Sequence, residues 1–429
     1  MTATDATRYL LPCATSFRCL DLFSILDDPG ELEDADGQVP FWPLFTTLLK
    51  SSIEIPTQLA ELLDTIAVTL RGSSGLAGDY ELLKSFISDL QPSFFKEYWP
   101  VIIRLALDLP HYFPNGSLQV LGAEGSPSPL KLNRDQSACL VVHQFLCTLR
   151  APIWREDFFD FSIWYASGQR HEQAYFAAID SSPVPLCPIE IMVVDKYQTY
   201  PAQLGLPSGA AVISANRYVG FGQSATQEEV QVGSSPEVCP AVLVTPSLEK
   251  NQVLVIRGAE AVLNITGQRR EIKAAAQEVG EPVNWRQRTM LFMDALELDV
   301  ESDENGLPDL APQNLTRDLN KATIAFSSGS YEVVYSPLWG CGAFRGDPFV
   351  KVMLLWCAAS VAHTSLKIIC NRESQEVAFS LNSLIAAAGK RLETAQGLIA
   401  LLESIPRKTA RLVTFDCMME RLSLLARES

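Results

Sequence analysis

The spacing of apolar residues changes near Pro185, and this change constrains the fold more than any other feature of the sequence. Before it, apolar residues recur at helical spacing in segments separated by helix breakers. After it, short runs rich in β-branched residues alternate with helical stretches. Such alternation predicts an α/β fold in which helices sandwich a mixed sheet. The expected strands are Ile189–Val194, Ala210–Ile213, Gln252–Ile256, Thr289–Met293 and Tyr331–Tyr335.

The sequence is expected to divide into two domains. Residues 1–150 are predicted to form an all-helical accessory region that packs on the α/β domain, because its helices carry apolar faces that need a partner. Residues 151–429 are predicted to form the α/β domain, with a long surface loop at the acidic stretch Asp299–Asn314 and helices at its C-terminal end. The expected helices are Pro56–Leu70, Asp79–Leu90, Phe95–Leu109, Asn133–Leu149, Asp347–Ala362, Leu381–Glu403 and Thr409–Ala426.

Composition limits the classes of function. The net charge of −16 argues against a broad basic face for nucleic acid, so no direct DNA binding is expected. The ten cysteines and four histidines lack the spacing of a zinc site or a disulfide framework, so neither a metal nor a cofactor is expected. No signal peptide is convincing, and the apolar run Val352–Ala362 is too short to span a bilayer. We therefore expect a soluble intracellular protein without a membrane partner.

Two loops that follow expected strands carry residues suited to ligand chemistry. Ligand sites in such sheets usually lie beyond the strand ends. The first loop, Asn216–Glu229, contains Gly220-Phe221-Gly222 and then Gln227-Glu228-Glu229. Glycines let backbone N–H groups approach a phosphate, and the helix start beyond them adds partial positive charge. A structural interpretation is also open, because acidic residues favour the exposed N-terminus of any helix.

The second loop, Trp339–Asp347, lies between an expected strand and a long apolar helix. It holds three glycines and two aromatic residues, as expected where a backbone passes close to a ligand beside a wall of rings. Asp347 is expected to cap the following helix, and Trp339 to support the loop from below. Capping does not explain the two glycines that flank Cys341.

Together the two loops resemble the poly(ADP-ribose) glycohydrolase family. Its signature is a glycine triplet followed by Gln-Glu-Glu, and Gly220-Phe221-Gly222 with Gln227-Glu228-Glu229 resembles a variant of it. The second loop is similar to the family segment Asn-Trp-Gly-Cys-Gly-Ala-Phe-Gly-Gly-Asp at Trp339–Phe344 and at Gly346-Asp347. Weaker similarity covers most of the chain from about Phe94 onward, at Leu105–Pro110, Gln136–Leu140, Phe145–Thr148, Asp294–Leu296 and Arg317–Ala322.

The resemblance implies a macrodomain-like fold and hydrolysis of the ribose–ribose O-glycosidic bonds of poly(ADP-ribose), which releases ADP-ribose. It implies that Glu229 protonates the leaving ribose oxygen and then activates water. Glu228, the second residue expected at the catalytic centre, is implied to hold ribose hydroxyls together with Asn216. The implied partners are poly(ADP-ribose), ADP-ribose and poly(ADP-ribosyl)ated proteins, in the nucleus, the cytoplasm or both. The residues implied to bind the substrate are Asn216, Gly220, Phe221, Gly222, Gln227, Gly340, Cys341, Gly342, Ala343, Phe344 and, at the adenine, Gln203.

The chain departs from the family pattern in both loops. Only four residues separate Gly222 from Gln227, and Phe221 replaces the middle glycine. Ile213, Leu338 and Ile272 stand where the family has an aspartate, an asparagine and an adenine-stacking tyrosine. Two other functions therefore stay open, a non-catalytic reader of ADP-ribose or its polymer and a hydrolase of single ADP-ribose units on proteins. The retained Glu228-Glu229 pair favours the glycohydrolase over the reader.

Overall fold

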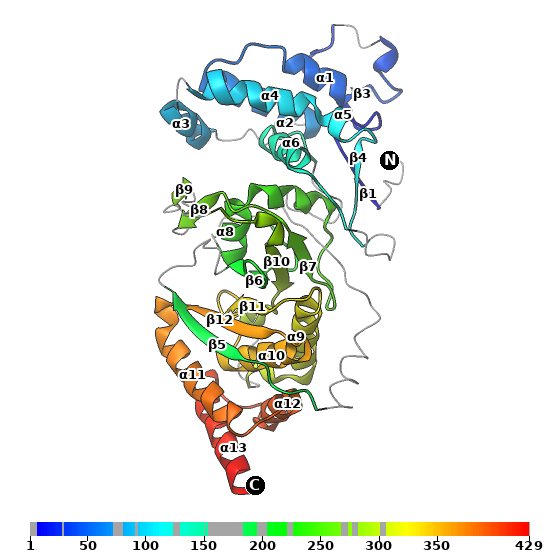
Figure 1. Ribbon diagram of the computed structural model, residues 1–429. Coiled ribbons are helices and arrows are strands. Elements are labelled where there is room, and N and C mark those ends of the chain that lie inside the picture. Colours follow the sequence, from blue (N-terminus) through cyan, green and yellow to red (C-terminus); the bar gives the residue numbers. More distant parts are fainter. Residues whose placement is uncertain are drawn as a thin grey trace. The chain divides into compact units, whose positions relative to one another are not determined.

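The protein is described from a computed structural model. The described residues are 7–27, 30–71, 80–90, 93–122, 129–150, 152, 183–194, 204–220, 226–266, 273–276, 282–300 and 306–428. They fall into two compact units, one up to residue 152 and one from residue 183 onward. Both units are drawn in Figure 1. Each encloses its own apolar core.

The first unit is mainly helical and is built around an aromatic core. The buried rings of Phe41 and Phe45 stack with centroids 5.6 Å apart, and Phe17 packs against Phe41. The helices predicted from the sequence are present, with Phe95–Leu109 divided into a π-helical turn and two helices. Its elements are α1 (Phe41–Leu48), α2 (Pro56–Arg71), α3 (Glu81–Leu90), η2 (Phe94–Tyr98), α4 (Trp99–Leu107), α5 (Leu109–Tyr112) and α6 (Arg134–Phe145).

Two short antiparallel strand pairs accompany these helices, so the first unit is not all-helical. β1 (Arg8–Leu10) pairs with β4 (Ser117–Gln119), and β2 (Arg18–Leu20) pairs with β3 (Gln38–Pro40). Strands of three residues carry too little alternation to be recognised in the sequence. The pairs hold segments that are far apart along the chain.

A six-stranded mixed sheet forms the centre of the second unit. In spatial order its strands are β5 (Ile189–Val194), β12 (Ser365–Asn371), β11 (Val333–Pro337), β6 (Ala210–Ala215), β10 (Thr289–Asp294) and β7 (Leu254–Arg257). β7 runs antiparallel to β10, and the other neighbours are parallel. All six residues of β10 are buried, as expected of a central strand covered on both faces. The strands predicted from the sequence are confirmed, with small changes at their ends.

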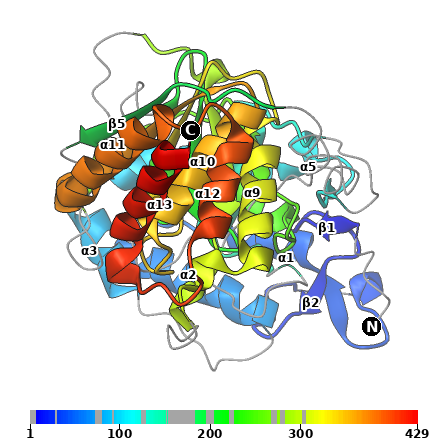
Figure 2. The ribbon, with the colours of Figure 1, turned by 90° about the horizontal axis from the view of Figure 1, so that it is seen from below.

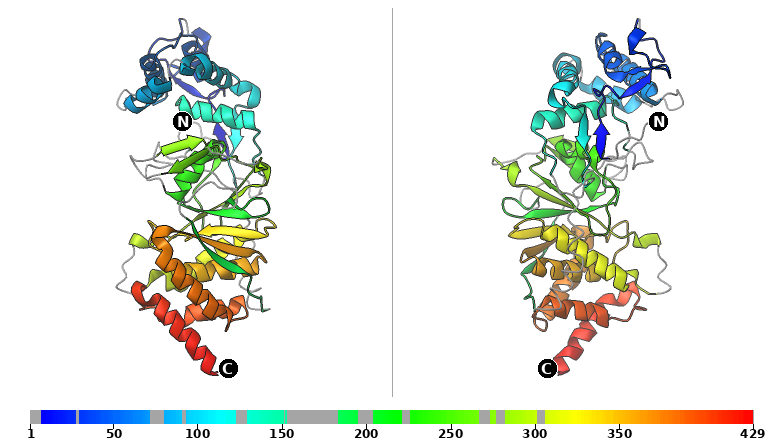
Figure 3. Two further views of the ribbon diagram at one scale, coloured as in Figure 1. Left: turned by 60° about the vertical axis from the view of Figure 1, so that its left-hand side comes forward. Right: turned by 90° about the vertical axis from the view of Figure 1, so that its right-hand side faces the viewer.

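Helices cover both faces of this sheet (Figures 1 and 3). One layer consists of helices from the C-terminal half, which Figure 2 shows side by side. On the other face α8 (Gln227–Ser234) packs against β6 and against a hairpin of β8 (Leu263–Thr266) and β9 (Lys273–Ala276). The predicted α/β sandwich is therefore confirmed. The C-terminal layer contains α9 (Pro312–Phe326), α10 (Pro348–Val361), α11 (Gln375–Gly389), α12 (Ala395–Ser404) and α13 (Thr414–Glu428).

The single helix predicted at Leu381–Glu403 is wrong, because α11 ends at Gly389 and α12 begins at Ala395. Between them the chain pairs with a distant segment. The Leu186 N–H donates to Glu393 O at 3.1 Å, and the Ala395 N–H donates to Val184 O at 2.8 Å. The Thr394 side chain then caps α12 by accepting the Gly397 N–H. This break depends on a tertiary contact that local periodicity does not contain.

The surface loop predicted at Asp299–Asn314 is also wrong for most of its described part. A short 3-10 helix, Pro308–Leu310, is buried, and α9 begins directly after it at Pro312. Leu307 and Leu310 belong to the apolar core of the unit. Asp309, whose acidity suggested a solvated loop, is 2% exposed and lies beside cations. No described helix has the length and apolar character needed to cross a membrane.

Candidate active site

The first loop of the candidate site is closed by Gln227, the first residue of α8. β6 pairs with β11 only at Ala210 and Ala211, which leaves the rest of that strand edge open. The Gln227 side chain fills this gap, because its oxygen accepts the Ser214 N–H at 2.8 Å and its amide donates to Val212 O at 3.2 Å. Gln227 thus acts as a strand partner that fixes α8 to the end of β6.

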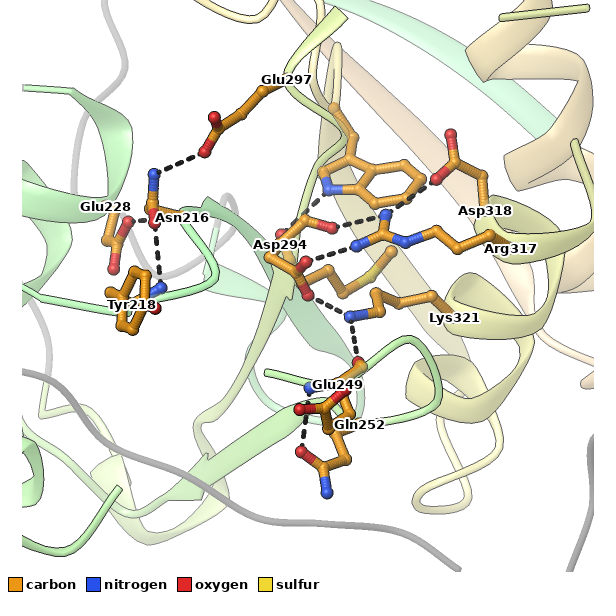
Figure 4. Close-up of polar contacts among 12 residues, drawn as sticks. Asn216, Tyr218, Glu228, Glu249, Gln252, Asp294, Glu297, Arg317, Asp318 and Lys321 are labelled. Atoms are coloured by element: carbon orange, nitrogen blue, oxygen red, sulfur yellow. Dashed lines mark hydrogen bonds and ion pairs between the residues drawn. The ribbon is translucent and has the colours of Figure 1, made fainter. Parts of the chain in front are cut away.

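Glu228 folds the chain after β6 back onto α8. One carboxylate oxygen accepts the Asn216 N–H at 2.9 Å (Figure 4). The other accepts the Gly220 N–H. The side chain is buried, with 5% of the residue exposed. Charge-assisted bonds to backbone N–H groups are among the stronger hydrogen bonds in proteins, so Glu228 holds the loop from Asn216 to Gly220 firmly.

Glu229 is half-buried and faces the start of its own helix. Its carboxylate accepts the Thr226 N–H at 2.7 Å, and the Thr226 hydroxyl accepts the Glu229 N–H at 3.5 Å. This is a capping box, which satisfies two N–H groups that a helix start leaves open. The neighbouring residues Phe221 and Gly222 lie outside the described residues.

Hydrogen bonds hold both the oxygen and the nitrogen of the Asn216 side-chain amide. Its oxygen accepts the Tyr218 N–H at 2.9 Å, and its amide donates to Glu297 at 3.4 Å. Glu297 is exposed and follows β10, which is paired with β6 through Asp294 and Ala215. The ends of the two parallel strands therefore bring Glu297 beside Asn216 (Figure 4).

The second loop rests on Trp339, as the sequence predicts. The Trp339 ring is fully buried and its N–H donates to Met293 O at 3.0 Å. Gly340 has a φ of +74° and a Cβ there would lie 2.9 Å from the Cβ of Ala295, so glycine is required. The loop closes where the Gly346 N–H donates to Gly340 O at 2.8 Å. The Gly340 N–H also donates to the Ser214 hydroxyl at 3.3 Å, which connects the two loops.

The tip of the second loop is open to a ligand. Gly342 and Ala343 are exposed, and a Cβ on Gly342 would meet nothing within 4 Å. Phe344 is partly buried against the core. Within the described part of the chain, the N–H groups of Gly342, Ala343 and Phe344 have no acceptor. Successive N–H groups of this kind form a concavity that suits an anion. Burial raises the pKa of the Cys341 thiol, which disfavours the reactive thiolate.

A network of buried charges connects the end of β10 to α9 (Figure 4). Asp294, at the end of β10, pairs with Arg317 and Lys321 of α9, and Lys321 also donates to Glu249 O at 2.9 Å. Arg317 further donates to Asp318 at 2.8 Å, and Asp318 pairs with Lys351 of α10. Burial lowers the pKa of Lys321 to about 8. Breaking such a network on one side would leave a buried charge without compensation, so these pairs fix the strand and helix ends that carry the site.

The residue that caps α10 belongs to the same buried region. Asp347 accepts the N–H groups of Phe349 and Val350 at 3.0 and 3.1 Å, which confirms its predicted capping role. Burial raises the pKa of Asp347 to about 6. Its own N–H donates to Asp309 at 2.9 Å.

Comparison with known proteins decides the family. Two sequence models match, one for the helical domain of poly(ADP-ribose) glycohydrolase at residues 88–179 and one for its macro domain fold at residues 182–377. Together they cover well over half of the chain. The chain belongs to the poly(ADP-ribose) glycohydrolase family.

Curated relatives agree with this assignment. Poly(ADP-ribose) glycohydrolases 1 and 2 of Caenorhabditis elegans are each 25% identical over 236 and 229 residues, which cover 49% of this chain. These regions are 29% and 47% of the relatives' own lengths, so the chain spans less than half of each. A solved structure of the Deinococcus radiodurans enzyme in complex with ADP-ribose is 15% identical, with a TM-score of 0.36, over 52% of this chain and 93% of that one.

The macrodomain of this glycohydrolase-family chain brings most of the predicted site residues to one edge of the sheet. Asn216, Gly220, Gln227, Glu228 and Glu229 surround the end of β6, and Ser214 connects them to the second loop at Gly340. Gln203 and Ile272, which concern the adenine, lie outside the described residues.

Three features of the site were missed in the sequence. Glu297 is adjacent to Asn216 only through strand pairing, so its position three residues after Asp294 was the available signal. Ser214 connects the loops, yet a serine in a strand carries no signal of its own. Asp294, Arg317, Asp318 and Lys321 lie in segments noted only for their family resemblance, because charged residues in a sequence normally indicate an exposed helix face.

Proposed function

We propose that the chain hydrolyses the ribose–ribose O-glycosidic bonds of poly(ADP-ribose) and releases ADP-ribose, with Glu229 as the acid–base residue. The observation that carries the proposal is the division of roles at the start of α8. Gln227 and Glu228 have their polar atoms occupied by the backbone of β6 and the following loop. Glu229, half-buried beside them, is the carboxyl group left for chemistry once it leaves its helix cap.

One carboxyl group serves both halves of the reaction. Glu229 first donates its proton to the oxygen of the departing ribose as the bond between that oxygen and the anomeric carbon breaks. The anomeric carbon develops oxocarbenium character, and a water oxygen then bonds to it. Glu229 takes the proton from this water, which returns the enzyme to its starting state. The proposed role of Glu228 is to position the loop, and that of Asn216 is to hold ribose hydroxyls.

The substrate diphosphate is proposed to lie against the open N–H groups of Gly342, Ala343 and Phe344, and against the turn that begins at Gly220. Phe344 would pack near the reacting ribose, with Gln203 at the adenine. The cations beneath the loops are compensated by Asp294, Asp309 and Asp318, so they shape the binding surface more than they add charge to it. We further propose poly(ADP-ribosyl)ated proteins as partners and the nucleus or cytoplasm as the location.

Incubation with purified poly(ADP-ribose) tests the proposal. Wild-type protein should release ADP-ribose, measured by liquid chromatography, and Glu229→Gln should not. Glu376→Gln is a matched control, because Glu376 is an exposed glutamate in the first turn of α11. Binding of the polymer without turnover would instead support a non-catalytic protein that reads ADP-ribose or its polymer. Comparable release of ADP-ribose from mono-ADP-ribosylated protein would support a hydrolase of single ADP-ribose units on proteins.

A further inference from the structure

The segment between α12 and α13 packs against residues 306–309, which in turn contact the end of the second loop. It lies beyond residue 377, where the family match ends. The Leu307 N–H donates to Arg407 O at 3.0 Å. Gly306, next to it, has a φ of +101°, and a Cβ at this position would lie 1.7 Å from Arg407 O. The chain around Gly306 and the segment from Arg407 to Thr414 are therefore in close backbone contact.

The same segment reaches the second loop through the buried carboxylate of Asp309. The Arg411 guanidinium lies 3.7 Å from one oxygen of Asp309. The other oxygen of Asp309 accepts the Asp347 N–H at 2.9 Å and lies 3.7 Å from the Lys351 ammonium. Arg411 thus lies beside the carboxylate that holds the Asp347 N–H, at the point where the loop becomes α10.

We propose that Arg411 is a positioning residue for the substrate loop, and that the segment Arg407–Thr414 is a buttress for the backbone from Gly340 to Asp347. Asp309 transmits the contact, since one of its oxygens lies 3.7 Å from the Arg411 guanidinium and the other accepts the Asp347 N–H. Lys351 is shared between Asp309 and Asp318, so it compensates Asp309 only in part. Burial raises the pKa of Asp309, and the charges of Lys351 and Arg411 oppose this. The effect on ligand binding rests on the proposed function, whereas the effect on loop geometry does not.

Arg411→Gln tests the buttress in the full chain. Arg421→Gln, on α13, is the matched control, because Arg421 forms no ion pair with any residue that the structure describes. Hydrogen–deuterium exchange should be about tenfold faster at residues 345–351 in Arg411→Gln and unchanged in Arg421→Gln. Arg411→Lys, which keeps the charge, should restore part of the protection.

Calorimetric titration with ADP-ribose gives a second readout. Arg411→Gln should weaken the affinity about fivefold to tenfold while the melting temperature stays near that of Arg421→Gln. Equal exchange at residues 345–351 in the two variants would overturn the buttress. A wild-type chain that binds and hydrolyses nothing would refute the proposed function alone, since the exchange measurement would still decide the role of Arg411.

Discussion

At the scale of single residues, adjacent glutamates in the signature have different physical roles. Glu228 is buried and accepts two backbone N–H groups, whereas Glu229 is half-buried and completes a capping box. The sequence motif predicts that both matter but does not separate them. The difference arises from helix geometry, because consecutive residues lie about 100° apart around an α-helix and face different neighbours.

The two residues should therefore differ in their effect on stability. Glu228→Gln replaces an acceptor oxygen with an amide that faces an N–H group, and should lower the free energy of unfolding by about 1–3 kcal/mol. Glu229→Gln should change it by less than about 0.5 kcal/mol, because glutamine also serves in a capping box. Urea denaturation of both variants measures this. Equal losses would show that the carboxylates share one role.

The glycines of the second loop should also separate into two kinds. Gly340→Ala places a Cβ at positive φ and 2.9 Å from Ala295, so the variant should lose about 1–3 kcal/mol of stability. Gly342→Ala meets open space and should stay within about 0.5 kcal/mol of the wild type. Its ADP-ribose affinity should nevertheless fall severalfold, because the new methyl group occupies the proposed diphosphate position. Undiminished affinity in Gly342→Ala would contradict that placement of the diphosphate.

At the scale of elements, the sequence predicts the strands well and the connections poorly. Five of the six strands of the sheet are apolar runs that local spacing identifies, whereas β12 (Ser365–Asn371) was not predicted. The order of the strands and the antiparallel direction of β7 follow from packing. The break between α11 and α12 depends on pairing with Val184 and Leu186, and the burial of Asp309 depends on Lys351 and Arg411. Such partners lie far apart in the sequence, so no local pattern contains them.

The N-cap of α10 should make stability depend on pH. The pKa of Asp347 is raised from 3.8 to about 6, so the folded state binds this proton more tightly than the unfolded state does. The resulting stability is present below pH 4 and is lost as the pH rises through about 6. Asp347→Asn keeps a side chain that can cap α10 and removes the carboxyl group that titrates.

The stability of the wild type relative to Asp347→Asn should therefore fall by about 1–3 kcal/mol between pH 4 and pH 7.5. Urea denaturation at several pH values gives this difference. Asp309, Arg411 and Thr414 surround Asp347 in both proteins, so their own effects largely cancel. If the free energy of unfolding depends on pH in the same way in both proteins, the pKa of the Asp347 carboxyl group is not raised in the folded state.

At the scale of the whole molecule, the residues that the family models match do not coincide with the folded units. The helical-domain match begins at residue 88, but the first unit includes residues before it. Phe41, Leu44 and Phe45 are fully buried there, and the Phe45 ring lies 5.6 Å from His143 of α6. Before about Phe94 the sequence shows little resemblance to the family. Apolar side chains from this region nevertheless build the core of the unit.

A chain that begins at residue 88 should therefore fail to fold its helical part. Removing these aromatic side chains exposes the apolar faces of α4 and α6, at a cost of several kcal/mol. Near-ultraviolet circular dichroism and limited proteolysis of residues 88–429 should show lost packing at α4 and α6. Proteolytic resistance equal to that of the full chain would mean that the first 87 residues are dispensable.

The central claim, that Glu229 performs acid–base catalysis on poly(ADP-ribose), is tested most directly by separating turnover from binding in Glu229→Gln. The rate of ADP-ribose release and the affinity for the polymer are measured on the same preparation. We predict a rate reduced by about 10²–10⁴-fold, with an affinity within about threefold of the wild type. Release at the wild-type rate, or an absence of release from the wild type itself, would contradict the claim.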